Sequence, residues 1–237
     1  MNVNFNACWK SLISASCIIT SLTAAHVASA STLIQGEVTA DNSFALYTGS
    51  KNNANTVWWA GGSEWGQPVS FNFKTSDSTL YIAAWSDDGS AQGLLQDLKA
   101  KGNRLLDKNW EVFATGIDLD SVNSPSPTLA ELTAQINIAN ADAGNPNTTS
   151  GGWVPVTIGG SNGIQPWGDL SSIDDDASWM WYDSGKQGGT LAPFRGGFDH
   201  DEYLIFRASV PEPSAVIALL AVSALGLGKL RRRHSGF

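Results

Sequence analysis

Hydrophobic positions along the chain fall into short runs that either alternate with polar residues or are apolar throughout. Phe71 and Phe73 alternate with Ser70 and Asn72, which is typical of a strand with one buried face. The run Leu80–Trp85 is almost wholly apolar and predicts a central strand covered on both faces. Strands are expected at Leu33–Thr39, Phe44–Tyr47, Thr56–Trp59, Val69–Phe73, Thr79–Trp85, Gly93–Leu98, Trp110–Thr115, Trp153–Ile158, Ser178–Tyr182 and Tyr203–Ala208.

One segment has the period of a helix. Thr128 and Glu131 have the spacing of a capping box, and Leu129, Leu132 and Ile136 then recur on one helical face. The pattern predicts a helix that ends near Ala141 and covers an end or edge of the strands. Many short strands, Gly-rich turns and one short covering helix together predict a mainly β fold, an antiparallel, jelly-roll-like β-sandwich.

The N-terminal segment has the pattern of an export signal. Lys10 precedes a run of apolar and small residues from Leu12 to Ala25. Ala28 and Ala30 follow in the small-x-small spacing that signal peptidase accepts. Residues 1–30 are therefore predicted to be a secretory signal helix cleaved after Ala30. The alternative is an N-terminal membrane anchor or a buried helix.

The C-terminal segment has three parts. A Pro211-Glu212-Pro213 triplet comes first, then an apolar run from Ala215 to Gly228, then a basic cluster that contains Arg231, Arg232 and Arg233. The apolar run is short for a stable membrane helix of about 20 residues. The basic cluster favours the cytoplasmic side, which places the preceding domain outside. The alternative is an ordinary tail anchor.

This tripartite segment resembles the PEP-CTERM sorting signal of bacterial exosortase substrates, over residues 210–234. The resemblance implies a transient inner-membrane anchor and processing near Pro211–Pro213 by an exosortase-type membrane protease. It also implies a bacterium that makes extracellular polysaccharide. The chain then divides into a signal peptide (1–30), a β-sandwich ectodomain (31–209) and a sorting segment (210–237).

The composition of the ectodomain restricts its chemistry. It holds 9 of the 14 basic residues and 21 of the 22 acidic residues, for a net charge of −12. Nucleic acid and anionic surfaces are poor partners for such a domain. Both cysteines, Cys8 and Cys17, lie in the signal segment, so the ectodomain has no disulfide and no thiolate ligand.

The front half of the ectodomain resembles the galactose-binding-like, jelly-roll lectin-type sandwich. The resemblance rests on Thr39–Tyr47 and on Tyr81–Gly89, followed by Gly93-Leu94-Leu95 and Trp110-Glu111-Val112. In that family the first segment is a turn into a strand, and the second is a core strand that ends in a loop. The resemblance implies a sugar-binding sandwich.

Tryptophan is frequent in this chain and is suited to sugar binding. An exposed indole stacks on the apolar face of a sugar ring. Trp58 and Trp59 are adjacent and are predicted to face opposite ways in a strand, one in the core and the other exposed or at an edge. Trp65 and Trp167 each precede a glycine in a predicted loop. Trp65, Trp167 and Trp58 are the candidate ligand-binding residues. The alternative is that these aromatic side chains fill the core.

Two acidic runs are candidate cation sites. Asp174, Asp175 and Asp176 form one, and Asp199 and Asp201 flank His200 in the other. Ca²⁺ takes carboxylate oxygens of this kind and is the one cofactor considered; otherwise none is expected. The alternative is a solvated acidic surface. No nucleophile elbow accompanies His200, the only histidine left after processing, so no catalytic residues are predicted.

The sequence therefore predicts an exported protein of the cell envelope, outer surface or extracellular matrix. It is expected to be non-enzymatic and to associate with extracellular polysaccharide. One alternative is a purely structural envelope or biofilm component. The other is a carboxylate-dependent glycan hydrolase, because paired carboxylates depend on three-dimensional geometry.

Overall fold

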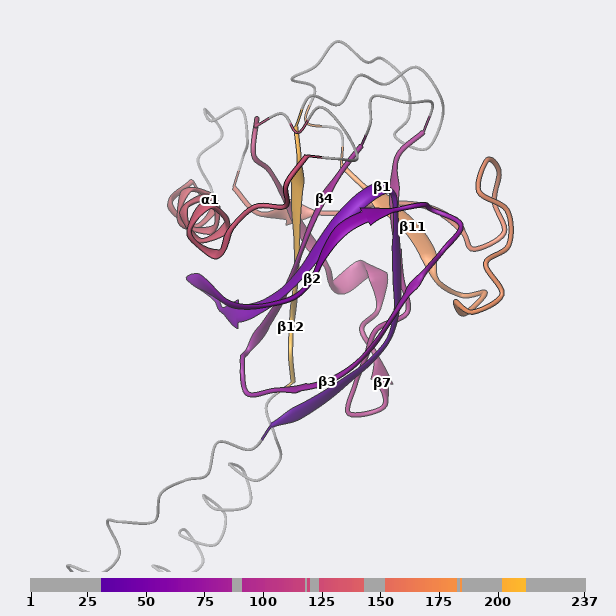
Figure 1. The fold of residues 1–237 in the computed structure, drawn as a ribbon, viewed down its shortest axis with the longest axis horizontal. Coiled ribbons are helices and arrows are strands. Elements are labelled where there is room, and N and C mark those ends of the chain that lie inside the picture. The colour runs from indigo at the N-terminus through magenta and orange to yellow at the C-terminus, as the bar shows by residue number, and fades with distance from the viewer. Residues whose placement is uncertain are drawn as a thin grey trace, which may run out of the picture. The chain divides into compact units, whose positions relative to one another are not determined.

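The computed structural model of the protein describes residues 31–86, 91–117, 119, 124–142, 152–182, 184 and 202–211. These residues form a mainly antiparallel β-sandwich with one α-helix (Figure 1), so the predicted fold class is confirmed. The two terminal helices that the sequence predicts lie outside the described residues. The strands are β1 (Thr32–Ser50), β2 (Asn53–Ser63), β3 (Val69–Thr75), β4 (Thr79–Trp85), β5 (Gly93–Gln96), β6 (Lys99–Ala100), β7 (Asn103–Arg104), β8 (Glu111–Ala114), β9 (Val154–Pro155), β10 (Thr157–Ser161), β11 (Ser178–Trp181) and β12 (Leu204–Ser209).

Strand β1 belongs to both sheets of the sandwich. Its first half pairs with β3 on one edge and with β5 and β6 on the other, and this sheet continues through β11 to β10. Its second half pairs with β2 and β4, and this sheet continues through β12 and β8 to β9. The sequence predicts two strands here, Leu33–Thr39 and Phe44–Tyr47. The chain instead stays in one strand that crosses from the first sheet to the second.

Alternating side chains of these strands build separate hydrophobic layers. Phe44 and Leu46 face the core between the sheets, whereas Ala45 and Tyr47 face the outer side of the second sheet. Strand β4 alternates in the same way and every one of its residues is buried. The prediction that Leu80–Trp85 is a central strand covered on both faces is therefore confirmed.

Helix α1 (Leu129–Ala141) provides the cover for the second sheet (Figure 1). The predicted capping box is present: the Glu131 N–H donates to Thr128 Oγ1 and the Thr128 N–H donates to the Glu131 carboxylate. Leu132 and Ile136 pack with side chains on the outer face of the second sheet. The strand that the helix mainly contacts is β2, an edge strand paired with β1, so the prediction of a helix over an edge is confirmed. Tyr47 donates a hydrogen bond to the Pro127 carbonyl at 2.6 Å, just before the helix, and burial raises its pKa.

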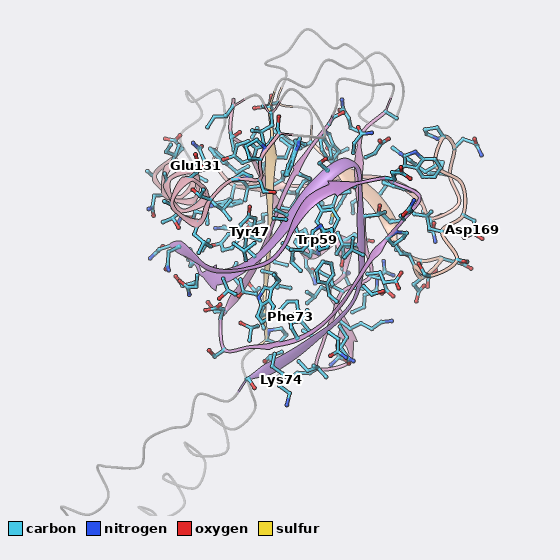
Figure 2. The ribbon with its side chains drawn as sticks, viewed as in Figure 1. Tyr47, Trp59, Phe73, Lys74, Glu131 and Asp169 are labelled. Atoms are coloured by element: carbon cyan, nitrogen blue, oxygen red, sulfur yellow. The ribbon has the colours of Figure 1, made fainter. Side chains whose placement is uncertain are left out.

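A loop covers the outer face of the first sheet. Residues 162–177 place Trp167, Leu170 and Ile173 against Leu95 of β5 and Trp179 of β11. The Asn162 amide holds the loop together, because it donates to the carbonyls of Leu170 and Ile173 and accepts from the Leu170 N–H. Figure 2 shows this loop, marked by Asp169, on the opposite side of the molecule from Glu131 of α1.

The two ends of the β-sandwich lie side by side. Thr32 Oγ1 donates to the Pro211 carbonyl at 3.2 Å, and the Val210 N–H donates to the Ser78 carbonyl at 2.8 Å. Strand β12, the last strand of the described residues, ends at Ser209. Among the described residues, no helix is long and apolar enough to cross a membrane.

Two fully buried glutamines differ in hydrogen bonding: the amide of Gln96 is fully partnered, whereas that of Gln92 is not. Gln96 donates to the Leu105 carbonyl and the Asp107 carboxylate, and its amide oxygen accepts from the Leu98 N–H. Within the described part of the chain, neither polar side-chain atom of Gln92 has a hydrogen-bond partner, nor does Ser43 Oγ or Ser86 Oγ. Gln92 adjoins Gly93, which pairs with Asp41 where β1 passes between the sheets. A buried amide without partners carries a desolvation cost that nothing offsets.

We expect Gln92→Met to leave the free energy of unfolding unchanged or to increase it, because the substitution removes an unpaired buried amide at similar volume. Gln96→Met is the matched control and should lose roughly 2–4 kcal/mol, because the buried Leu105 carbonyl, Asp107 carboxylate and Leu98 N–H each lose a hydrogen-bond partner. Urea unfolding of the purified full chain, followed by circular dichroism, measures both values. Equal losses in the two variants would contradict the prediction.

Candidate functional site

A β-bulge decides where the Trp58–Trp59 pair points. Trp59 lies opposite Leu46 and Val57 lies opposite Tyr47, so Trp58 is an extra residue in β2 without a partner in β1. Both indoles contact one aromatic cluster: Trp58 stacks on Phe73, and Trp59 packs near Phe44. The prediction that the two tryptophans face opposite ways is wrong, because it assumed the regular alternation that a bulge interrupts.

Trp58 is an exposed and firmly held indole. The residue is 37% exposed, although one ring face stacks on Phe73 with centroids 4.0 Å apart and planes 16° from parallel. Its Nε1–H donates to Thr48 Oγ1 at 3.0 Å. Figure 2 shows Trp59 and Phe73 on the side of the sandwich formed by β2 and β3. Trp58 therefore offers a pre-oriented aromatic surface at a sheet edge.

Trp65 is also exposed, as the sequence predicts for a loop tryptophan. Its side chain is 38% exposed in the turn between β2 and β3. Thr39 Oγ1 donates to its carbonyl at 2.8 Å, and the Gln67 N–H closes the turn on the Glu64 carbonyl. The backbone of Trp65 is thus fixed, while its ring makes no contact with the ring of any other described aromatic residue.

Trp167 is a core residue and not an exposed ligand contact. Only 3% of its surface is exposed, and its ring stacks on Trp179 at a centroid distance of 3.9 Å. Its Nε1–H donates to Asp41 Oδ2 at 2.7 Å. The prediction of Trp167 as a ligand-binding residue is wrong, because its N–H is bonded to a buried carboxylate and its ring is covered by a second indole.

The structure does not gather the acidic run into a metal site. Asp174, Asp175 and Asp176 are exposed in the loop before β11, and Asp174 accepts a hydrogen bond from the Asp176 N–H. In the described part of the chain, no group of three or more His, Cys, Asp or Glu side chains could hold a metal ion. Asp199 and Asp201 lie outside the described residues, as do Ala28, Ala30, Glu212, Pro213 and Arg231, Arg232 and Arg233.

Two buried carboxylates belong to an ion-pair network that sequence reasoning did not single out. Arg104 lies 3.2 Å from Asp107 and 3.6 Å from Asp97. Burial raises the pKa of the Asp107 carboxyl, although the Arg104 guanidinium and donors from Ser178 and Gln96 act in the opposite direction. The arrangement ties the β6–β7 hairpin to the 3₁₀ turn Asp107–Asn109 and to β11.

A polar hollow of about 330 Å³ lies on the outer face of the second sheet. Its lining comes from the β1–β2 turn, the starts of β4 and β8, and the end of β12. The lining residues are Lys51, Ser78, Thr79, Asn109, Glu111, Arg207, Ala208 and Ser209. Sequence reasoning missed this hollow. One signal was available, since Arg207 is a lone charge within the apolar strand Leu204–Ser209.

Arg207 is fixed on all sides. Its Nε and Nη2 contact Glu111 Oε2 at 2.8 and 2.7 Å, and its guanidinium lies 3.9 Å above the Trp153 ring. Its Nη1 donates to Asn140 Oδ1 at 3.2 Å. Tyr81 lies opposite Arg207 on the neighbouring strand β4. Burial raises the pKa of Tyr81 to about 12, while the Arg207 charge acts in the opposite direction.

Asn140, near the end of α1, joins the walls of the hollow. Its Oδ1 accepts from Trp153 Nε1 as well as from Arg207, and its Nδ2 donates to the Lys51 carbonyl at 3.0 Å. One side chain therefore connects the helix, the β1–β2 turn and the arginine. This arrangement can present hydroxyl, amide, carboxylate and ammonium groups to a small polar ligand.

Comparison with protein-family models, with curated proteins and with solved structures gave no match for this chain.

We expect Asn140→Ala to reduce the free energy of unfolding by about 1–3 kcal/mol, because the partly buried groups of Trp153 and Arg207, and the exposed Lys51 carbonyl, lose a partner. Asn137→Ala on the exposed side of the same helix is the matched control and should change stability by less than about 0.5 kcal/mol. Thermal and urea unfolding of the full chain measure the difference. Similar values for the two variants would show that Asn140 does not join these elements.

Proposed function

We propose that the protein is an exported, non-enzymatic protein of the bacterial surface or extracellular matrix that associates with extracellular polysaccharide. Its last segment would act as a sorting handle, read and removed by an exosortase-type membrane protease. The exposed, immobilised indole of Trp58 is the observation that carries the polysaccharide part. The Pro211-Glu212-Pro213 triplet and the segment after it carry the sorting part.

The arrangement of the chain ends supports a removable handle. Among the described residues, the last strand ends at Ser209, and Pro211 lies beside Thr32 at the start of the first strand. Cleavage between 211 and 213 would therefore leave every described strand and the helix intact. Cleavage after Ala30 would likewise precede the first residue of β1. Both processing steps would leave the β-sandwich whole.

The sorting proposal predicts the mass of the mature protein. In the native bacterium, the surface fraction should contain a chain that begins at Ser31 and ends near Pro211–Pro213, measured by intact-mass spectrometry. Glu212→Ala should retain the protein in the inner membrane with its C-terminus intact. Glu64→Ala, in an exposed turn, is the control and should be sorted normally. A surface form that still carries residues 215–233 would contradict the proposal.

The polysaccharide proposal rests on the cost of ordering a binding surface. A free tryptophan loses rotamer freedom when a ligand binds. Trp58 is already held by the Phe73 ring and by Thr48 Oγ1, yet more than a third of its side chain stays exposed. A sugar ring could stack on this surface with little ordering cost.

We expect native gels cast with dextran, xanthan, alginate or hydroxyethyl cellulose to retard the full chain in at least one polymer. Trp58→Ala should weaken that retardation by roughly tenfold, and Trp58→Phe should retain part of it, because an aromatic ring remains. Val57→Ala is the control, since Val57 is the equally exposed neighbour.

The rivals give different results in the same assay. A purely structural component would migrate alike in all gels. A carboxylate-dependent hydrolase would release reducing sugar from the polymer that retains it, and the proposal expects none. Retardation that is equal in wild type and Trp58→Ala would remove Trp58 from the binding surface.

A further inference from the structure

The hollow beside Arg207 carries one unbalanced positive charge. Of its three charged lining residues, Glu111 and Arg207 neutralise each other in a two-point ion pair. Lys51 is exposed at the tip of the β1–β2 hairpin, and its ammonium makes no ion pair within the described part of the chain. Asp77, the nearest carboxylate in sequence to the lining residue Ser78, accepts a hydrogen bond from Asn55 at 2.7 Å.

This charge stands out against the rest of the ectodomain, whose formal net charge is −12. A positive lining in a negative domain selects against cationic ligands and favours a ligand with a single negative group. Because Arg207 already uses its guanidinium on Glu111, Asn140 and Trp153, the anionic group would pair with Lys51 and not with Arg207.

The remaining lining groups suit hydroxyls. Ser78, Thr79 and Ser209 carry hydroxyl groups, Asn109 an amide, and Glu111 a second carboxylate oxygen. A hollow of about 330 Å³ lies at the small end of ligand pockets and matches one sugar ring better than a longer oligomer. No aromatic side chain forms part of the described lining, so polar contacts would dominate recognition.

We propose that this hollow binds a single uronic-acid unit, with the sugar carboxylate on Lys51 and the ring hydroxyls on the serine, asparagine and glutamate side chains. The inference rests on the proposed association with polysaccharide and names the acidic sugar class that one subsite would take. It is separate from the Trp58 surface, which faces the aromatic cluster of β2 and β3.

Saturation-transfer NMR titration of the full chain with sodium D-glucuronate, sodium D-galacturonate, glucose, galactose and acetate tests the proposal. At low salt, at least one uronate should bind roughly threefold to tenfold more tightly than its neutral counterpart, and acetate should not compete well. Lys51→Gln should abolish the preference for the uronate. Lys74→Gln, an exposed lysine outside the hollow, should preserve it.

A second variant should change the affinity for the uronate in the opposite direction. Glu111→Gln removes a negative charge from the lining and should increase affinity for the uronate, provided that circular dichroism shows the native fold. Equal binding of uronate and neutral sugar, or a preference that survives Lys51→Gln, would overturn the inference. If no monosaccharide binds while gels still show retardation that depends on Trp58, only this inference fails. If uronate binds through Lys51 but no gel retards the protein, the proposed polysaccharide association fails instead.

Discussion

The whole sandwich depends on the register of β1, since this one strand supplies hydrogen bonds to both sheets. A shift by one residue would exchange Phe44 and Leu46 with Ala45 and Tyr47. The core would then receive a tyrosine hydroxyl that now bonds Pro127, and the helix would face two bulky side chains instead. Because β3, β5 and β6 pair with the first half and β2 and β4 with the second, an error in one sheet would propagate to the other.

The loop over the first sheet and the helix over the second are each held in place by the side chain of one asparagine. Residues 31–237 contain no cysteine, so no disulfide among them can fasten a loop or helix to the strands. A single asparagine does so on each side: Asn162 closes the loop over the first sheet, and Asn140 joins α1 to the β1–β2 turn over the second. Each side chain satisfies at least three partners, which is close to the full capacity of an amide. Apolar contacts hold the loop and the helix against the sheets, and the hydrogen bonds of the two asparagine amides fix one orientation of each.

Local patterns predicted the elements well, and contacts between distant residues account for the errors. The Thr128–Glu131 box and the apolar run Leu80–Trp85 are local signals, and both are confirmed. The bulge at Trp58 depends on how many residues β1 places opposite it, and the burial of Trp167 depends on Asp41, which lies 126 positions away in the chain. Neither is visible in a short window of sequence. The polar hollow is also assembled from separate elements, so the lone charge of Arg207 was its only signal in the sequence.

The β1–β2 hairpin carries residues of both candidate surfaces, and helix α1 binds the tip of this hairpin. Lys51 is at the hairpin tip, and Trp58 lies farther along β2. The helix holds the tip twice: Thr133 Oγ1 accepts from the Ala54 N–H at 3.2 Å, and Asn140 bonds the Lys51 carbonyl. Strand β2 is held in the sheet by its pairing with β1, and Trp58 by Phe73 and Thr48. The helix therefore does more than shield Tyr47 and Tyr81, because it also fixes the hairpin tip that carries Lys51.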